Sequence, residues 1–140
     1  MRAARHKTLK RPAARHRRAP IGCGVDVVEL PRLKQAIARG GETFLRRVFT
    51  PQERAYAQAR RRTQLLHLAG RFAAKEAVIK AMSQLNPSRL LAMNQIEVRN
   101  DRFGRPHIRL HGRRAARVRL YVSLSHVNSV AVASAIAIRG

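Results

Sequence analysis

The amino-acid sequence predicts a single α+β domain, with a mostly antiparallel sheet packed on a long helix. Apolar residues recur at three- to four-residue steps in the first half of the chain, whereas short stretches with alternating or continuous apolar residues dominate after Pro87. Helices followed by mostly sequential strands are typical of this class. A chain of 140 residues with 45% hydrophobic residues suits one domain of this kind rather than two.

The helical half begins after one strand. Ile21 to Leu30 is a β-branched run with glycines, which predicts a buried strand. Pro31 suits the first turn of a helix that the Gly40–Gly41 pair would end. Thr50 to Glu53 read as a capping box that opens a second helix, and Thr63 to about Leu85 have the period of the main packing helix.

The second half of the chain predicts four strands and one clear turn. Asp101 to Gly104 has the composition of a turn and connects the first two strands. The predicted strands are Gln95 to Arg99, His107 to Leu110, Val118 to Ser125 and Val130 to Ile138.

The charge of the chain indicates an anionic partner. Lys and Arg number 30 against 7 Asp and Glu, which gives a net charge of +23. Residues 1–19 hold eight basic and no acidic residues, and we expect them to form a disordered basic tail before a domain at residues 20–140. Such a start is also typical of an organellar transit peptide, but the basic character continues beyond it, with 22 basic and 7 acidic residues left.

Membrane insertion, secretion and cysteine-based stabilisation are all disfavoured. No apolar run approaches the roughly 20 residues needed to cross a bilayer, and the first 20 residues lack the apolar stretch of a secretory signal. We therefore expect a soluble, cytoplasmic protein without a membrane partner. Cys23 is the one cysteine, which excludes an internal disulfide and a multi-cysteine zinc site.

Among the seven carboxylates, Asp26 and Glu76 are the candidates for chemistry. Asp26 lies inside a predicted buried strand, where an unpaired charge would cost several kcal/mol. Glu76 falls within the apolar stripe of the long helix, between Phe72 and Ile79. Two acids that point into apolar surroundings suggest a shared cation.

Three cations flank Glu76 on the same helix. Arg71 and Lys75 are four residues apart, and Lys80 is four residues after Glu76. One acid needs only one partner, so the surplus positive charge suits phosphate groups, while the acids would hold Mg²⁺ together with phosphate oxygens and water. The alternative is a buried ion pair between these acids and an Arg or Lys, which requires no metal.

Several segments, in this order, resemble the small bacterial holo-[acyl-carrier-protein] synthases of the 4′-phosphopantetheinyl transferase superfamily. The helix segment is the most specific of them. The resemblance covers residues 21 to about 138 and rests on Ile21–Glu29 (IGCGVDVVE), Phe49–Glu53 (FTPQE), Leu68–Ala81 (LAGRFAAKEAVIKA), Asp101-x-x-Gly104-x-Pro106, and Val122–His126 (VSLSH).

The resemblance implies a Mg²⁺-dependent enzyme of fatty acid and lipid metabolism. Such an enzyme transfers phosphopantetheine from coenzyme A to a serine of apo acyl carrier protein and releases adenosine 3′,5′-bisphosphate. Asp26 and Glu76 match the positions that bind the metal, and Glu76 is the candidate for taking the serine proton. Lys80 matches the residue that counters charge on the phosphates.

Five further positions match residues around the coenzyme. Arg71 and Lys75 match positions near its phosphates, and His126 matches one at the nucleotide end, although a strand-end histidine bonded to backbone would look the same. Gly104 and Pro106 match a loop beside the nucleotide, or form a plain hairpin turn. The family's glycine-rich stretch after the long helix has no counterpart, because residues 83–93 contain no glycine.

The implied partners are an acidic acyl carrier protein and further copies of the chain. In the family, basic residues of the first helix meet the carrier, and the candidates here are Arg32, Lys34, Arg39, Arg46 and Arg47. The family's small members are homotrimers with active sites between subunits.

The main rival function is a ribosomal-type RNA-binding protein, which the charge alone would favour. Both functions can hold together, with the tail contacting RNA nonspecifically. A trimeric scaffold without catalysis is the third reading.

Overall fold

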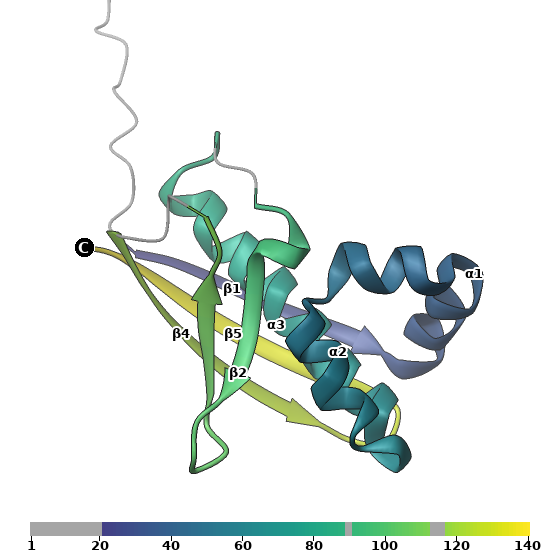
Figure 1. Ribbon diagram of the computed structural model, residues 1–140. Helices are drawn as coiled ribbons and strands as arrows, with labels where there is room; N and C mark the ends of the chain where they lie inside the picture. Colours follow the sequence, from purple (N-terminus) through teal and green to yellow (C-terminus); the bar gives the residue numbers. More distant parts are fainter. Residues whose placement is uncertain (1–20, 89–90, 113–116) are drawn as a thin grey trace, which may run out of the picture.

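The computed structural model describes residues 21–88, 91–112 and 117–140, and it confirms an α+β domain (Figure 1). The predicted basic tail lies outside the described residues. Every predicted helix and strand is present, and the bounds agree within a few residues except at the end of the first helix. The elements are β1 (Ile21–Glu29), α1 (Leu30–Val48), α2 (Pro51–Gln58), the 3₁₀ turn η1 (Arg61–Thr63), α3 (Gln64–Leu85), the 3₁₀ turn η2 (Met93–Gln95), β2 (Ile96–Asn100), β3 (Pro106–Leu110), β4 (Val118–His126) and β5 (Val130–Arg139).

The strands form two antiparallel sheets. One sheet has the order β1-β5-β4, so that the first and last strands of the chain pair, with Asp26 opposite Ala133. The other is the β2–β3 hairpin, in which Asp101 accepts the turn hydrogen bond from the Gly104 amide at 3.0 Å. The antiparallel pairing was expected, but the division into two sheets was not.

Helix α3 packs across one face of the three-stranded sheet, against β1 and β5. The core between them consists mostly of small side chains, because alanines line both surfaces. These alanines are Ala69, Ala73, Ala74, Ala77 and Ala81 on α3, and Ala131, Ala133, Ala135 and Ala137 at alternate positions of β5. Of the larger residues that predicted the helix, Leu68 and Met82 are buried with the alanines, whereas Leu65, Phe72 and Ile79 are only half-buried. Small side chains let the helix lie close to the sheet.

Two glycines of β1 bring the strand almost onto the backbone of α3. A Cβ on Gly22 would stand 2.0 Å from the Ala81 carbonyl oxygen, and one on Gly24 would stand 2.1 Å from the Ala77 carbonyl oxygen. Both distances are far inside van der Waals contact, so a side chain at either position would push the strand away. This close approach sets the height of Asp26 relative to the helix.

Helix α1 departs from its expected end. The sequence places the end at Gly40–Gly41, but the chain kinks at Gly41 (φ 55°, ψ −143°) and then stays helical to Val48. The positive φ is available to glycine without strain, so the pair bends the helix instead of ending it. The capping box at the start of α2 is confirmed: Thr50 Oγ1 accepts from the Glu53 amide and Glu53 Oε2 accepts from the Thr50 amide.

Candidate functional site

The strand β1 and the helix α3 bring Asp26 and Glu76 to one cavity. Side chains alternate along β1, so Asp26 points to the same face as Gly22 and Gly24. Gly22 lies against Ala81 and Gly24 against Ala77, so the strand and the helix run side by side. Two residues of a strand advance by about 6.6 Å and four residues of a helix by about 6 Å, so the two elements stay in step. The next residue on this face of the strand, Asp26, therefore lies beside the helical turn that contains Glu76. Both residues line a cavity of about 610 Å³ between β1, α1 and α3.

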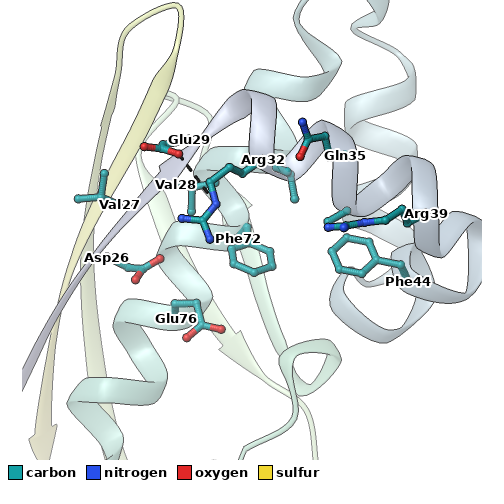
Figure 2. A pocket seen from close by; sticks show the side chains of 12 residues that line it. Asp26, Val27, Val28, Glu29, Arg32, Gln35, Arg39, Phe44, Phe72 and Glu76 are labelled. Carbon is teal, nitrogen blue, oxygen red and sulfur yellow. Dashed lines mark ion pairs between the residues drawn. The ribbon is translucent and has the colours of Figure 1, made fainter.

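Figure 2 shows the carboxyl groups of Asp26 and Glu76 facing this cavity. Helix α1 supplies the opposite wall, with Arg32 and Arg39, and the ring of Phe72 lies beside Arg32. Three acids, Asp26, Glu29 and Glu76, and two cations therefore line the cavity, and Arg32 forms an ion pair with Glu29 at 3.9 Å.

Lys80 forms an ion pair with Asp26. Its ammonium group donates to Asp26 Oδ1 and to the Val25 carbonyl, both at 2.9 Å. The side chain of Asp26 is 18% exposed and that of Lys80 is 51% exposed. The alternative of a buried ion pair without a metal is therefore met for one oxygen of Asp26. Its partner is Lys80, which the family resemblance matches to a residue that counters charge on the phosphates.

Glu76 has no ion-pair partner among the described residues. Its pKa is raised above the usual value, first by burial and then by the negative charge of Asp26, while Lys80 acts in the opposite direction. Asp26 and Glu76 thus share one nearby lysine, which pairs with Asp26, and the carboxylate of Glu76 is not neutralised by an ion pair.

This donor set fits Mg²⁺. The ion prefers oxygen ligands and commonly takes one or two carboxylates, with substrate phosphates and water completing its octahedral coordination. Asp26 and Glu76 supply two carboxylates at an open cavity, and a cation there would offset the burial and the repulsion from Asp26 that together raise the pKa of Glu76. No group of three or more His, Cys, Asp or Glu side chains suitable for a metal occurs in the described part of the chain, so a bound ion would need ligands from substrate and water.

A second pocket, of about 230 Å³, gathers four of the predicted coenzyme-binding residues. Arg71 comes from α3, Gly104 and Pro106 from the β2–β3 hairpin, and His126 from the end of β4. The sequence reading did not identify three other polar residues that line it: Tyr56, His67 and Asn100. Asn100 directly precedes the turn motif at Asp101, and its place beside this motif is the one feature of the sequence that could have indicated a role in the pocket.

Arg71 is the central cation of this pocket. Its residue is only 5% exposed, and burial lowers the pKa of its guanidinium, while Glu53 acts in the opposite direction. Nη2 donates to Asn100 Oδ1 at 3.2 Å, Nη1 donates to the His67 carbonyl at 3.4 Å, and Nε has no partner in the described structure. A buried cation without a carboxylate partner is suited to an anionic ligand.

Lys75, which the resemblance placed near the coenzyme phosphates, lies in the core instead. Its side chain is fully buried, and Nζ forms an ion pair with Glu53 Oε2 at 2.6 Å and donates to the carbonyls of Val48 and Met93 at 2.6 and 3.1 Å. Neither the carboxylate cavity nor the Arg71 pocket includes it among its lining residues. Glu53 explains this placement. The sequence predicts it only as a helix cap, but its carboxylate also binds Lys75.

The geometry of α3 separates the two cavities. Arg71 and Glu76 are five residues apart, which is about 140° around the helix axis, so they face different sides. Glu76 and Lys80, four residues apart, face the same side. The predicted acidic and nucleotide-end residues therefore do not meet within one copy of the chain.

Comparisons with known proteins show the family of this chain. The model of the 4′-phosphopantetheinyl transferase superfamily matches residues 22–135. The chain belongs to this superfamily. A holo-[acyl-carrier-protein] synthase of Protochlamydia amoebophila is 38% identical over 83% of this chain and 96% of its own length, and one of Mycolicibacterium smegmatis is 40% identical over 84% and 96%.

Solved structures of the superfamily share the fold. The ACPS–CoA complex of Chronobacterium ammoniagenes superposes with a TM-score of 0.74 at 38% identity, and it covers 86% of this chain and 98% of its own. The holo-[acyl-carrier-protein] synthase of Helicobacter pylori in complex with coenzyme A has a TM-score of 0.66 at 25% identity, with 84% and 99% covered.

Proposed function

We propose that this protein is a holo-[acyl-carrier-protein] synthase, which transfers 4′-phosphopantetheine from coenzyme A to a serine of an apo acyl carrier protein. One observation carries the proposal: the two carboxylates that match the family's metal positions come from β1 and α3 to a single cavity, next to a lysine. Membership of the superfamily and the coenzyme A complexes of its structural relatives support the substrate.

Asp26 and Glu76 are the proposed Mg²⁺ ligands. When bound, the ion would neutralise the coenzyme pyrophosphate and polarise the phosphorus toward attack. Glu76 is the proposed acceptor of the proton from the carrier serine, directly or through water. Lys80, held by Asp26, is placed to stabilise negative charge on the transferred phosphate.

The Arg71 pocket is the proposed site for the nucleotide end of coenzyme A. Gly104 and Pro106 form one wall, and Arg71 and His126 supply donors for phosphate or ribose oxygens. This pocket and the carboxylate cavity share no lining residue. We therefore propose that a complete active site combines the carboxylate cavity of one subunit with the Arg71 pocket of its neighbour.

The open face of the three-stranded sheet supports assembly. Among the described residues, several large apolar side chains on this face are about half exposed: Ile21, Val25, Val27, Tyr121 and Ile136. An apolar surface of this kind on one side of a sheet is typical of an interface. We propose that it is covered by neighbouring copies in a homotrimer, as the family resemblance implies.

Helix α1 is the proposed docking element for the carrier. Arg32 and Arg39 stand at the wall of the carboxylate cavity, and a net charge of +23 would speed the encounter with an acidic protein. The predicted contact of the tail with nucleic acid concerns residues outside the described structure. Within the described residues, no helix has the length and apolar character to cross a membrane.

The proposal is tested by incubating the protein with coenzyme A, Mg²⁺ and several apo carrier proteins. We expect a carrier of increased mass, by one phosphopantetheine group, in the presence of Mg²⁺ and its loss with a chelator. Glu76→Gln should abolish the product, whereas Glu42→Gln, an exposed carboxylate outside the cavity, should not. Absence of product with every carrier would refute the proposed function.

A further inference from the structure

The position of Arg71 depends on few strong contacts. Its two hydrogen bonds, to Asn100 and to the His67 carbonyl, are long for a charged donor, and no carboxylate of the described residues lies within ion-pair distance. Two long hydrogen bonds alone do not fix the orientation of a guanidinium group. A further contact is needed to hold Arg71 in the orientation that faces the pocket.

The ring of Tyr56 supplies that contact. The Cζ atom of Arg71 lies 4.1 Å from the ring centroid, within the range of a cation–π interaction. Tyr56 comes from α2, and it lines the same pocket as Arg71. The ring therefore presents a flat, negative face to a buried cation.

The ring itself is held on two further sides. His67 packs against it edge to face, with centroids 5.3 Å apart and planes at 89°. The guanidinium of Arg60 lies 3.6 Å from the ring centroid, and its Nη1 donates to the Tyr56 carbonyl at 3.1 Å. Tyr56 is thus a fixed support rather than a mobile side chain.

We propose that Tyr56 is a positioning residue that holds Arg71 ready to bind a phosphate group of coenzyme A. The inference rests on the proposed function and deepens it, since it assigns a role to a residue that neither the sequence motifs nor the resemblance singled out. Tyr56 acts through Arg71 and need not touch the ligand. The proposal assigns this positioning to the ring face, over which the Cζ atom of Arg71 lies, so Tyr56→Phe, which keeps the ring, should preserve the function.

The experiment compares Tyr56→Met with Tyr56→Phe. Methionine has a good helix propensity and a similar length but offers no aromatic face. We expect Tyr56→Met to raise the KM for coenzyme A about three- to tenfold, the range of one exposed to partly buried cation–π contact, with kcat and the KM for the carrier little changed. The Kd for adenosine 3′,5′-bisphosphate, measured by calorimetry without carrier, should rise by the same factor. Tyr56→Phe should stay within about twofold of the parent protein.

A double-mutant cycle with Arg71→Met separates positioning from packing. If Tyr56 acts through Arg71, adding Tyr56→Met to Arg71→Met should change neither the KM nor the Kd further. A packing role would instead persist in the Arg71→Met background. KM does not depend on the concentration of folded enzyme, so partial unfolding of a variant lowers the apparent kcat without imitating the predicted effect.

The outcomes distinguish this inference from the proposed function. A parent protein that modifies no carrier refutes the proposed function, and the nucleotide Kd of the variants still tests the role of Tyr56. An active parent protein with equal KM values in Tyr56→Met and Tyr56→Phe overturns the inference alone. Additive effects in the cycle overturn it as well.

Discussion

Lys75 offers the most direct test of the structure, because the family resemblance places it near the coenzyme phosphates whereas the structure places it in the core. Its ammonium group is completely buried and contacts the Glu53 carboxylate and two backbone carbonyls. Lys75→Met keeps the length of the side chain but removes the charge. The Glu53 carboxylate then remains buried, with only the amides of Thr50 and Val98 as donors.

Removal of one partner from a buried ion pair costs about 3–5 kcal/mol, because the other charge stays desolvated. Domains of this size are stable by about 5–15 kcal/mol, so the variant should lose a large share of its stability and melt about 10 °C lower or more. Adding Glu53→Gln should recover part of the loss, since it removes the unpaired charge, while its single carbonyl oxygen keeps an acceptor for one of the two amides.

Urea unfolding at fixed protein concentration measures this effect, because assembly would make the midpoint depend on concentration. Lys34→Met is the matched control, since Lys34 is exposed on α1 and should change stability by less than about 0.5 kcal/mol. A Lys75→Met protein of unchanged stability with an increased KM for coenzyme A would refute the core placement and return Lys75 to the ligand.

Three other predictions follow from the site and its support. Glu76→Gln should abolish transfer yet unfold at a higher urea concentration at pH 7, because a raised pKa in the folded state means that the charged carboxylate destabilises it; the advantage should disappear as the pH falls below the unfolded value of 4.5. Glu97→Gln should show the opposite sign. Burial alone would raise the pKa of Glu97, but hydrogen bonds from Arg99, Thr50 and His111 outweigh it and lower the pKa, so the variant should lose stability at pH 7 and approach the parent protein as the pH falls below 4.5. Gly24→Ala should reduce both stability and transfer, since its Cβ would stand 2.1 Å from the Ala77 carbonyl oxygen and force β1, with Asp26, away from α3.

Each of these has an outcome that contradicts it. Equal urea midpoints of Glu76→Gln and the parent protein from pH 4 to pH 8 would mean that Glu76 is solvated, and a less stable variant would restore the buried ion-pair reading. A pH-independent loss in Glu97→Gln would assign its effect to packing. Ser134→Ala, on the open face of β5, is the control for Gly24→Ala, which should be the more destabilised of the two. Full activity of Gly24→Ala would show that the close approach is unnecessary.

The sequence reading located most elements because their signals are local. The capping box at Thr50 needs only residues within one helical turn, and the turn at Asp101 needs only four residues. The helix of residues 64–85 was visible from its larger apolar residues, although its core face is alanine. The kink at Gly41 was mistaken for a helix end because glycine permits both, and packing beyond the turn decides between them.

The amino-acid sequence by itself determined the class of fold, the excess of positive charge, and the two acids whose position in apolar stretches makes them candidates for the site. Residue type and local spacing are enough for such statements. Only the tertiary structure decided which partner each charge meets: Asp26 pairs with Lys80, Glu76 is left without a cation in the described part of the chain, and Lys75 is bound by Glu53. These pairings join residues 22 to 54 positions apart, and they depend on how closely backbones approach, which no local pattern encodes.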